Sequence, residues 1–134
     1  MSEENVEIVR EAFAAWNRGD GPGMEAYIDP GWEWRTAQKF PGVDAVYRGK
    51  DGFRRFWKTF REPWESIRIK LEKVENLGDG RVLALMTFQG KGKDSGVDVT
   101  TEYANVITVQ DGLFVHSVGY TDWRSALGAA GLSE

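Results

Sequence analysis

The sequence of 134 residues contains no cysteine and a single histidine, His116. Disulfides and thiolate chemistry are therefore excluded, and one histidine cannot build a multi-histidine metal site. No apolar run approaches the ~18 residues that suggest a transmembrane helix, so no membrane partner is expected. We expect neither a metal site nor a cofactor.

Positively charged residues are outnumbered by negatively charged ones. Lys and Arg number 17 against 21 Asp and Glu, which leaves a formal net charge of −4. Nucleic-acid binders commonly carry a basic surplus, so no nucleic-acid partner is expected. The acidic segment 1–9 is unlike a signal peptide, which favours a cytoplasmic location. The length and uniform composition predict one domain over residues 1–134.

Aromatic residues are abundant by contrast, at 13% of the chain, with six Trp, seven Phe and four Tyr. Rings in that number can fill a core, line an apolar cavity or face a partner subunit. Sixteen Gly against four Pro indicate many turns and some curvature in a sheet.

Apolar residues at helical spacing predict amphipathic helices at residues 3–18 and 51–61. Their aromatic faces carry Phe13 and Trp16 in the first, and Phe53, Phe56, Trp57 and Phe60 in the second. Shorter helices are expected at residues 24–28 and 122–130.

Alternation with a period of two dominates the second half of the chain and predicts strands. We expect strands at residues 32–35, 45–47, 66–74, 81–89, 97–110 and 113–120. Helices followed by a four-stranded antiparallel meander make an α+β fold, with helices on one face of a curved sheet.

The long strand 97–110 has one face that is more apolar than the other. Its odd-numbered residues, among them Tyr103 and Asn105, are expected to face the helices. The even-numbered residues of strand 97–110 then face outward. Leu83 and Leu85 of the preceding strand face outward with them. Apolar groups on that face need cover, and no helix remains to supply it. We therefore expect a homodimer through the outer face of the sheet.

Several short motifs occur in an order that is typical of one family. They are Ala15-Trp16-Asn17-Arg18-Gly19-Asp20, Tyr27-Ile28-Asp29-Pro30, Trp32-Glu33-Trp34-Arg35, Tyr47-Arg48-Gly49-Lys50-Asp51-Gly52, Asp111-Gly112 and Tyr120-Thr121-Asp122-Trp123, with Ala126-Leu127 and Ala129-Ala130-Gly131-Leu132 at the end. Together these motifs resemble the NTF2-like superfamily and, within it, the SnoaL-like group. The resemblance implies a cone-shaped α+β barrel, in which a strongly curved, mostly antiparallel sheet wraps around N-terminal helices and encloses a pocket. Isomerases, cyclases, epoxide hydrolases, dehydratases and non-catalytic binders share this fold.

The resemblance makes Asp122 a candidate catalytic residue, because SnoaL-type polyketide cyclases use an acid/base aspartate between the last strand and the final helix. An aspartate at an apolar pocket mouth can have a raised pKa and transfer a proton next to a carbonyl. Asp122 also fits the N-cap of the helix that follows it, where backbone N–H groups would lower the pKa. Capping preference favours the second interpretation, and both stay open.

Ketosteroid isomerases resemble this chain in fold, but their functional positions differ here. The base position falls on Arg35 or Thr36, the tyrosine position at or beside Ala12, and the second acid position on Asn105. Isomerisation by that mechanism is therefore not expected. Asn105 can still donate to a carbonyl oxygen or serve as a structural amide, and Tyr103 is a polar candidate in the same apolar row.

Two other catalytic arrangements receive less support. Limonene-epoxide hydrolases use an Asp-Arg-Asp set, which Glu33, Arg35 and Asp122 do not reproduce. A lone histidine can be a base near neutral pH, but the strand parity of His116 places it on the outer face, at an interface or the surface.

The pocket that the resemblance implies needs apolar walls and small inward residues. The candidate ligand-binding residues are Phe13, Trp16, Trp34, Arg35, Phe56, Trp57, Ala84, Met86, Ser117 and Gly119. Periodicity alone does not separate core from pocket wall.

We expect a protein that binds a small hydrophobic or ring-containing molecule, with cofactor-free acid/base chemistry through Asp122, Asn105 and Tyr103 as its catalytic form. The alternative is a non-catalytic ligand-binding or dimerisation module. A cavity below roughly 100 Å³ could not take a pocket-sized ligand, since ligand pockets usually measure about 300–1,000 Å³, and it would favour a non-catalytic interaction module.

Overall fold

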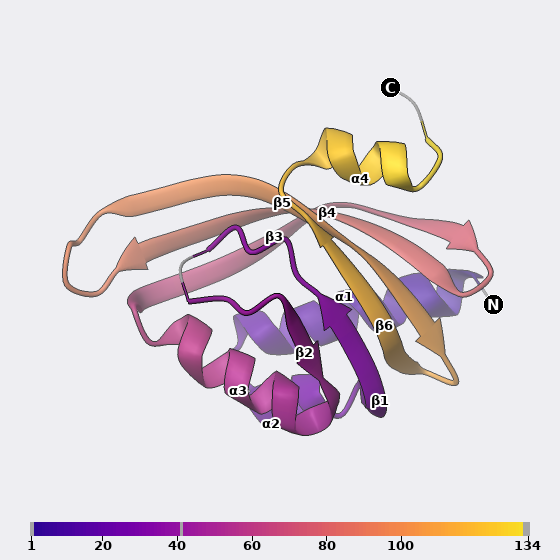
Figure 1. Cartoon of the computed structure of the whole chain (residues 1–134), viewed down its shortest axis with the longest axis horizontal. Coiled ribbons are helices and arrows are strands. Elements are labelled where there is room, and N and C mark those ends of the chain that lie inside the picture. The colour runs from indigo at the N-terminus through magenta and orange to yellow at the C-terminus, as the bar shows by residue number, and fades with distance from the viewer. Residues whose placement is uncertain (1, 41, 133–134) are drawn as a thin grey trace.

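The computed structural model describes residues 2–40 and 42–132, and it has the α+β architecture that the sequence predicts (Figure 1). In chain order the elements are α1 (Ser2–Asn17), α2 (Gly21–Glu25), β1 (Ile28–Arg35), β2 (Val46–Arg48), α3 (Gly49–Arg61), β3 (Trp64–Gly78), β4 (Arg81–Gly92), β5 (Asp98–Gln110), β6 (Leu113–Tyr120) and α4 (Trp123–Ala129). No helix within the two described ranges is long and apolar enough to cross a bilayer.

The six strands form one sheet in the order β2-β1-β6-β5-β4-β3. Strands β3 to β6 make the predicted antiparallel meander, while β1 pairs in parallel with β6 and antiparallel with β2. Register shifts interrupt the β3–β4 ladder at three points, and such bulges bend a strand and increase its twist. The sheet is curved, as predicted, but it does not close into a barrel, because β2 and β3 remain its edges (Figure 1).

The structure corrects the short helix that the sequence predicts at residues 24–28. Helix α2 begins at Gly21, because the Asp20 carboxylate accepts a hydrogen bond from the Gly23 N–H at 2.9 Å and caps the first turn. Ile28 instead begins β1, where it pairs with Phe114 of β6. The predicted strand 113–120 is confirmed as β6, and the other predicted helices and strands are present with shifted ends.

The first three helices lie on the concave side of the sheet (Figure 1). The predicted parity of β5 is confirmed there, because Asn105 and Ile107 are buried on the same side as the helices. Ala84 and Met86 of β4 are completely buried in the same core. The main hydrophobic core therefore sits between the concave face and the aromatic faces of α1 and α3.

Helix α4 lies on the opposite side of the sheet from the other helices (Figure 1). A second apolar cluster forms beneath it from Leu83, Leu85, Ala104, Val106 and Ala126. The Trp123 Nε1–H donates to the Met86 carbonyl at 2.9 Å and ties α4 to the sheet. The premise that no helix remains to cover this face is therefore wrong. A homodimer through the outer face loses that argument and stays a prediction.

Strand β3 is an edge of the sheet, and Asn17 pairs with it as a neighbouring strand would. Its Nδ2 donates to the Ile69 carbonyl at 2.8 Å, and its Oδ1 accepts from the Ile69 N–H at 2.8 Å. These two bonds satisfy backbone groups that an edge strand otherwise leaves open. They also fasten the C-terminal end of α1, and with it Trp16, to the sheet.

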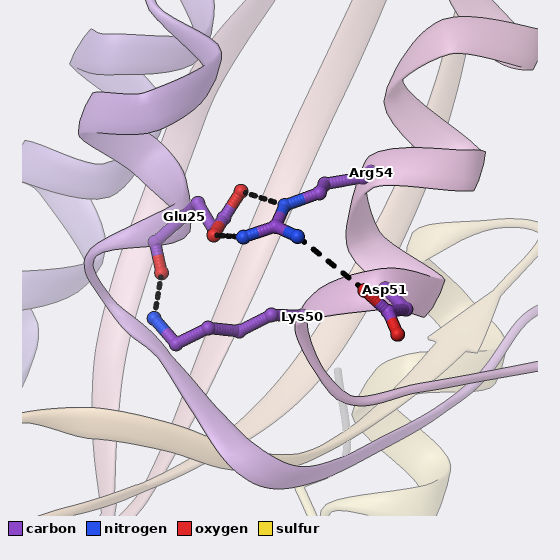
Figure 2. Close-up of polar contacts among 4 residues, drawn as sticks. All are labelled: Glu25, Lys50, Asp51 and Arg54. Atoms are coloured by element: carbon purple, nitrogen blue, oxygen red, sulfur yellow. Dashed lines mark hydrogen bonds and ion pairs between the residues drawn. The ribbon is translucent and has the colours of Figure 1, made fainter.

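Charged side chains clasp α2 to the start of α3, as Figure 2 shows. Arg54 donates to the Glu25 carboxylate at 2.8 Å and 2.6 Å, a bidentate pair that lowers the pKa of Glu25. Lys50 donates to the Glu25 carbonyl at 3.1 Å, and Arg54 also lies 3.4 Å from Asp51. The clasp holds Met24, the neighbour of Glu25 in the chain, against the helical side of the core.

Replacing Asn17 by Ala should lower the free energy of unfolding by about 1–2 kcal/mol, because both Ile69 backbone groups lose their partner. Urea denaturation followed by circular dichroism measures the change. The matched control is Asn5→Ala in the same helix, since Asn5 has no side-chain hydrogen bond within the described residues. The control should stay within about 0.5 kcal/mol of the parent. Equal losses of stability in both variants would contradict the stabilising role of the Asn17–Ile69 hydrogen bonds.

Candidate functional site

A cavity of about 80 Å³ lies between the concave face of the sheet and helices α1, α2 and α3. It is lined by Phe13, Trp16, Met24, Ile28, Trp32, Trp34, Thr36, Ala37, Gln38, Lys39, Phe40, Val43, Phe53, Phe56, Phe60, Tyr103, Asn105, Ile107, Phe114, Ser117 and Gly119. An engineered cavity of about 150 Å³ admits benzene. The enclosed space here therefore holds only a few non-hydrogen atoms, and a larger ligand must extend through the mouth.

Aromatic rings form most of the cavity wall. Trp32 and Trp34 stack with their centroids 5.8 Å apart, and Phe56 stands edge-on to Trp34 at 4.6 Å. Trp16 stacks on the other side of this group, 5.9 Å from Phe56. Stacked and edge-to-face rings attract one another beyond their apolar burial, so the wall is a preformed apolar surface.

Asn105 and Ser117 are the buried polar side chains among the described residues, with exposed fractions of 5% and 4%. Each accepts a hydrogen bond from an indole. The Trp34 Nε1–H donates to Asn105 Oδ1 at 3.1 Å, and the Trp32 Nε1–H donates to Ser117 Oγ at 3.1 Å. The two bonds join β1 to β5 and β6 across the inside of the cavity, and they fix which atom of each polar group is occupied.

Tyr103 is half-buried at the cavity wall. Its hydroxyl has no hydrogen-bond partner within the described part of the chain. Burial raises the pKa of the Tyr103 phenol well above its ordinary value. At neutral pH the phenol therefore keeps its proton and is available as a hydrogen-bond donor.

Trp16 has an exposed fraction of 3%, and its Nε1 is the buried side-chain polar atom that lacks a partner in the described ranges. The Arg61 guanidinium lies over its ring at 4.7 Å and over the ring of Trp57 at 4.4 Å. A permanent positive charge therefore borders the outer side of the aromatic wall.

The loop after β1 forms the mouth of the cavity. Gln38 is exposed there, while Thr36 and Phe40 are half-buried. Lys39 Nζ donates to the backbone carbonyls of Glu102 and Thr121. The ammonium group is thus held by the protein's own carbonyls, and it ties the loop to β5 and to the segment after β6.

Titratable groups are rare in the lining, which contains no Asp, Glu or His. Lys39 and Tyr103 are its ionisable members. No group of three or more His, Cys, Asp or Glu that could hold a metal ion occurs in residues 2–40 and 42–132.

Asp122 lies outside the cavity lining. Its Oδ1 accepts a hydrogen bond from the Ser125 N–H at 2.7 Å, so Asp122 is the N-cap of α4 on the outer side of the sheet. This hydrogen bond lowers the pKa of Asp122, which is the opposite of what a general acid requires. The capping interpretation is therefore confirmed, and the geometry offers no support for acid/base chemistry by Asp122 in the cavity.

The structure brings together most of the other predicted site residues. Those that line the cavity are Phe13, Trp16, Trp34, Phe56, Tyr103, Asn105, Ser117 and Gly119. Arg35 is exposed and lies 3.4 Å from Glu33. Trp57 packs edge-on against Trp16 at 4.9 Å, away from the lining. Ala84 and Met86, also predicted to contact a ligand, lie in the core rather than at the cavity surface.

A cluster of charged residues surrounds Glu33 on the outer side of β1. Its carboxylate lies 3.1 Å from Arg48 and 3.9 Å from His116. Such exposed pairs contribute little to stability. His116 therefore faces away from the cavity, as its strand parity predicts.

Some lining residues escaped the sequence interpretation. Trp32 carried a usable signal, because it shares the strand parity of Trp34. Phe114 did not, because a register shift between β5 and β6 puts it on the same face as Ser117 despite its opposite parity. The mouth loop 36–40 has no periodicity that sequence analysis can use.

Comparison with known proteins identifies relatives of this arrangement. The SnoaL-like domain family matches residues 9–117. No functionally curated protein matches the chain in sequence.

Solved structures share the fold over nearly the whole chain. An NTF2-like protein from Burkholderia thailandensis is 27% identical, with a TM-score of 0.73 and coverage of 95% of this chain and 96% of that one. TerC, co-crystallised with polyporic acid, is 17% identical, with a TM-score of 0.78 and coverage of 96% and 98%. A ketosteroid isomerase-like protein from Catenulispora acidiphila, in complex with trimethylamine, is 15% identical, with a TM-score of 0.75 and coverage of 94% and 93%.

Asp122→Ala should destabilise the protein at neutral pH, whereas Asp122→Asn should not, because Asn is an equally good N-cap. The lowered folded-state pKa of Asp122 means that its charge adds stability above the unfolded pKa of about 3.9. That contribution is lost as the pH falls through the still lower folded pKa. Urea midpoints of the parent and the Ala variant, measured near neutrality and below about pH 3, test whether this contribution is lost at low pH. An Ala variant as stable as the parent at neutral pH would contradict the capping role.

Proposed function

The chain belongs to the SnoaL-like domain family, and from that premise we propose that it is a non-catalytic binding protein whose cavity takes a small apolar molecule. The observation that carries this proposal is the composition of the lining, in which aromatic walls surround two oriented polar groups without any Asp, Glu or His. The cavity volume of about 80 Å³ is below the usual size of ligand pockets and favours an interaction module over a pocket-sized ligand, so the proposal is limited to an occupant of a few non-hydrogen atoms.

The lining argues against acid/base catalysis. A general base must lie within hydrogen-bond reach of the proton that it removes. Tyr103 is protonated at neutral pH, since burial raises its pKa, and Lys39 is held by backbone carbonyls at the mouth. Asp122 caps α4 on the other side of the sheet. The cavity therefore offers hydrogen-bond donors and apolar contact but no carboxylate or imidazole base.

The same lining favours ligand binding. A preformed apolar cavity with a few placed polar groups is the usual form of a small-molecule site. The unpaired Nε1–H of Trp16 is a buried donor that calls for an explanation, and an occupant with an acceptor supplies one. Structures of this fold have been solved with polyporic acid and with trimethylamine, which supports a small-molecule binding role without naming the ligand here.

The dimerisation module receives less support than the binding protein. The outward-facing Leu83 and Leu85 are covered by α4 of the same chain, so an exposed apolar face no longer calls for a partner. A cytoplasmic location stays a prediction.

Cyclopentane is a suitable first probe, because it is apolar and close to benzene in size, so it fills the enclosed space and extends into the mouth. Titration of the ¹⁵N-labelled protein should shift the indole N–H signals of Trp32 and Trp34. Ala37→Phe places a ring at the mouth and should weaken binding at least about tenfold by filling the space. The matched control, Ala129→Phe on the exposed side of α4, should bind as the parent does. Unperturbed indole signals at saturating probe would refute the binding proposal.

A further inference from the structure

We propose that the indole N–H groups of Trp32 and Trp34 set the hydrogen-bonding polarity of the cavity, so that it selects a small neutral carbonyl compound. This inference rests on the proposed binding function and deepens it. It assigns these two tryptophans a role in specificity that is separate from their contribution to the apolar wall.

The first step concerns the atoms that the indoles occupy. Asn105 has an acceptor end and a donor end, and the Trp34 N–H takes the acceptor end at 3.1 Å. The Trp32 N–H takes an acceptor position of Ser117 at the same distance. What remains is the Nδ2–H₂ of Asn105 and the hydroxyl of Ser117, which can donate its O–H and keeps one further lone pair. No hydrogen bond from either donor occurs within the described residues.

The second step concerns the orientation of the Asn105 amide. Asn105 Oδ1 lies against the backbone of Gly119, so close that a Cβ on Gly119 would be 3.2 Å from it. The same Cβ would be 3.0 Å from the Ala37 N. The oxygen is therefore enclosed by Gly119 and the indole of Trp34, which leaves it poorly accessible to a ligand. Rotation of the amide would leave the Trp34 N–H facing another donor, which is unfavourable in a buried site.

Other unpaired polar groups of the wall can also donate a hydrogen bond. The buried Nε1–H of Trp16 can only donate, and the hydroxyl of Tyr103, which stays protonated at neutral pH, can donate as well as accept. Thr36, whose hydroxyl donates to the Asp44 carbonyl, and the exposed Gln38 lie at the mouth. The enclosed part of the cavity therefore offers more donors than acceptors and favours an occupant that carries an acceptor.

The third step concerns charge. A cation finds no carboxylate in the lining, and the charges near the wall, Lys39 and Arg61, are themselves positive. An anion would lose its hydration among aromatic rings without a free cation to pair with, because Lys39 is bound to two carbonyls. A neutral oxygen acceptor meets neither penalty. A ketone, aldehyde, ester or amide of a few carbons fits both the donors and the volume.

Three five-membered rings of similar size separate the relevant chemistry in the full chain. Cyclopentanone has only an acceptor, pyrrole has only a donor, and cyclopentane has neither. Dissociation constants from ¹⁵N-HSQC titration should rank cyclopentanone tightest, about tenfold tighter than pyrrole, because a buried donor facing a donor forfeits a hydrogen bond. The side-chain amide signals of Asn105 should move with cyclopentanone and not with cyclopentane.

Trp34→Phe tests whether the indole sets this polarity. It keeps a ring in the wall but frees the Asn105 amide to rotate, so the preference for cyclopentanone over pyrrole should fall below about threefold. The control is Trp57→Phe, which alters an indole outside the lining and should leave the preference unchanged.

Each outcome has a defined meaning. Equal affinity of the parent for cyclopentanone and pyrrole would overturn the polarity inference even if Trp34→Phe fails to fold, while the binding function would stand. A preference that survives unchanged in Trp34→Phe would overturn the role of the indole. Failure of all three probes to perturb the cavity would refute the proposed function and this inference together.

Discussion

Two indole N–H groups inside an apolar cavity must each find an acceptor, and the rest of the site follows from how they do so. Trp32 and Trp34 project from β1 toward the meander, where Ser117 of β6 and Asn105 of β5 accept their hydrogen bonds. An unpaired buried N–H costs free energy comparable to a lost hydrogen bond, so these bonds lock the position of β1 against the sheet. They also orient the polar groups that a ligand would meet.

The same arrangement supports the proposal that the cavity serves binding rather than proton transfer. Rings from α1, α3 and β1 pack against each other, which keeps the wall preformed. The polar groups set into that wall are amides and hydroxyls, whose protons stay in place at neutral pH. The carboxylate with the best family precedent, Asp122, is committed to the first turn of α4.

Much of the fold was predictable, because local patterns determine it. The spacing of Phe13 and Trp16 revealed the buried face of α1, and the alternation in β5 placed Asn105 toward the helices. The cover of the outer face was not predictable in the same way. Leu83 and Leu85 indicate that an apolar group must cover them. The local pattern does not indicate that α4 of the same chain turns back to do so.

The sequence by itself determined the α+β class, the aromatic helical faces, the parity of β5 and the capping preference of Asp122, because each depends on neighbours within a few residues. Only the tertiary structure decided which of those residues border the cavity. Packing separated Trp57 and Arg35 from the lining, and a register shift between β5 and β6 brought Phe114 into it. The pairing of Trp34 with Asn105 spans 71 positions. Side-chain partners that far apart are selected by the three-dimensional demand that buried polar groups be satisfied, and no local pattern encodes that choice.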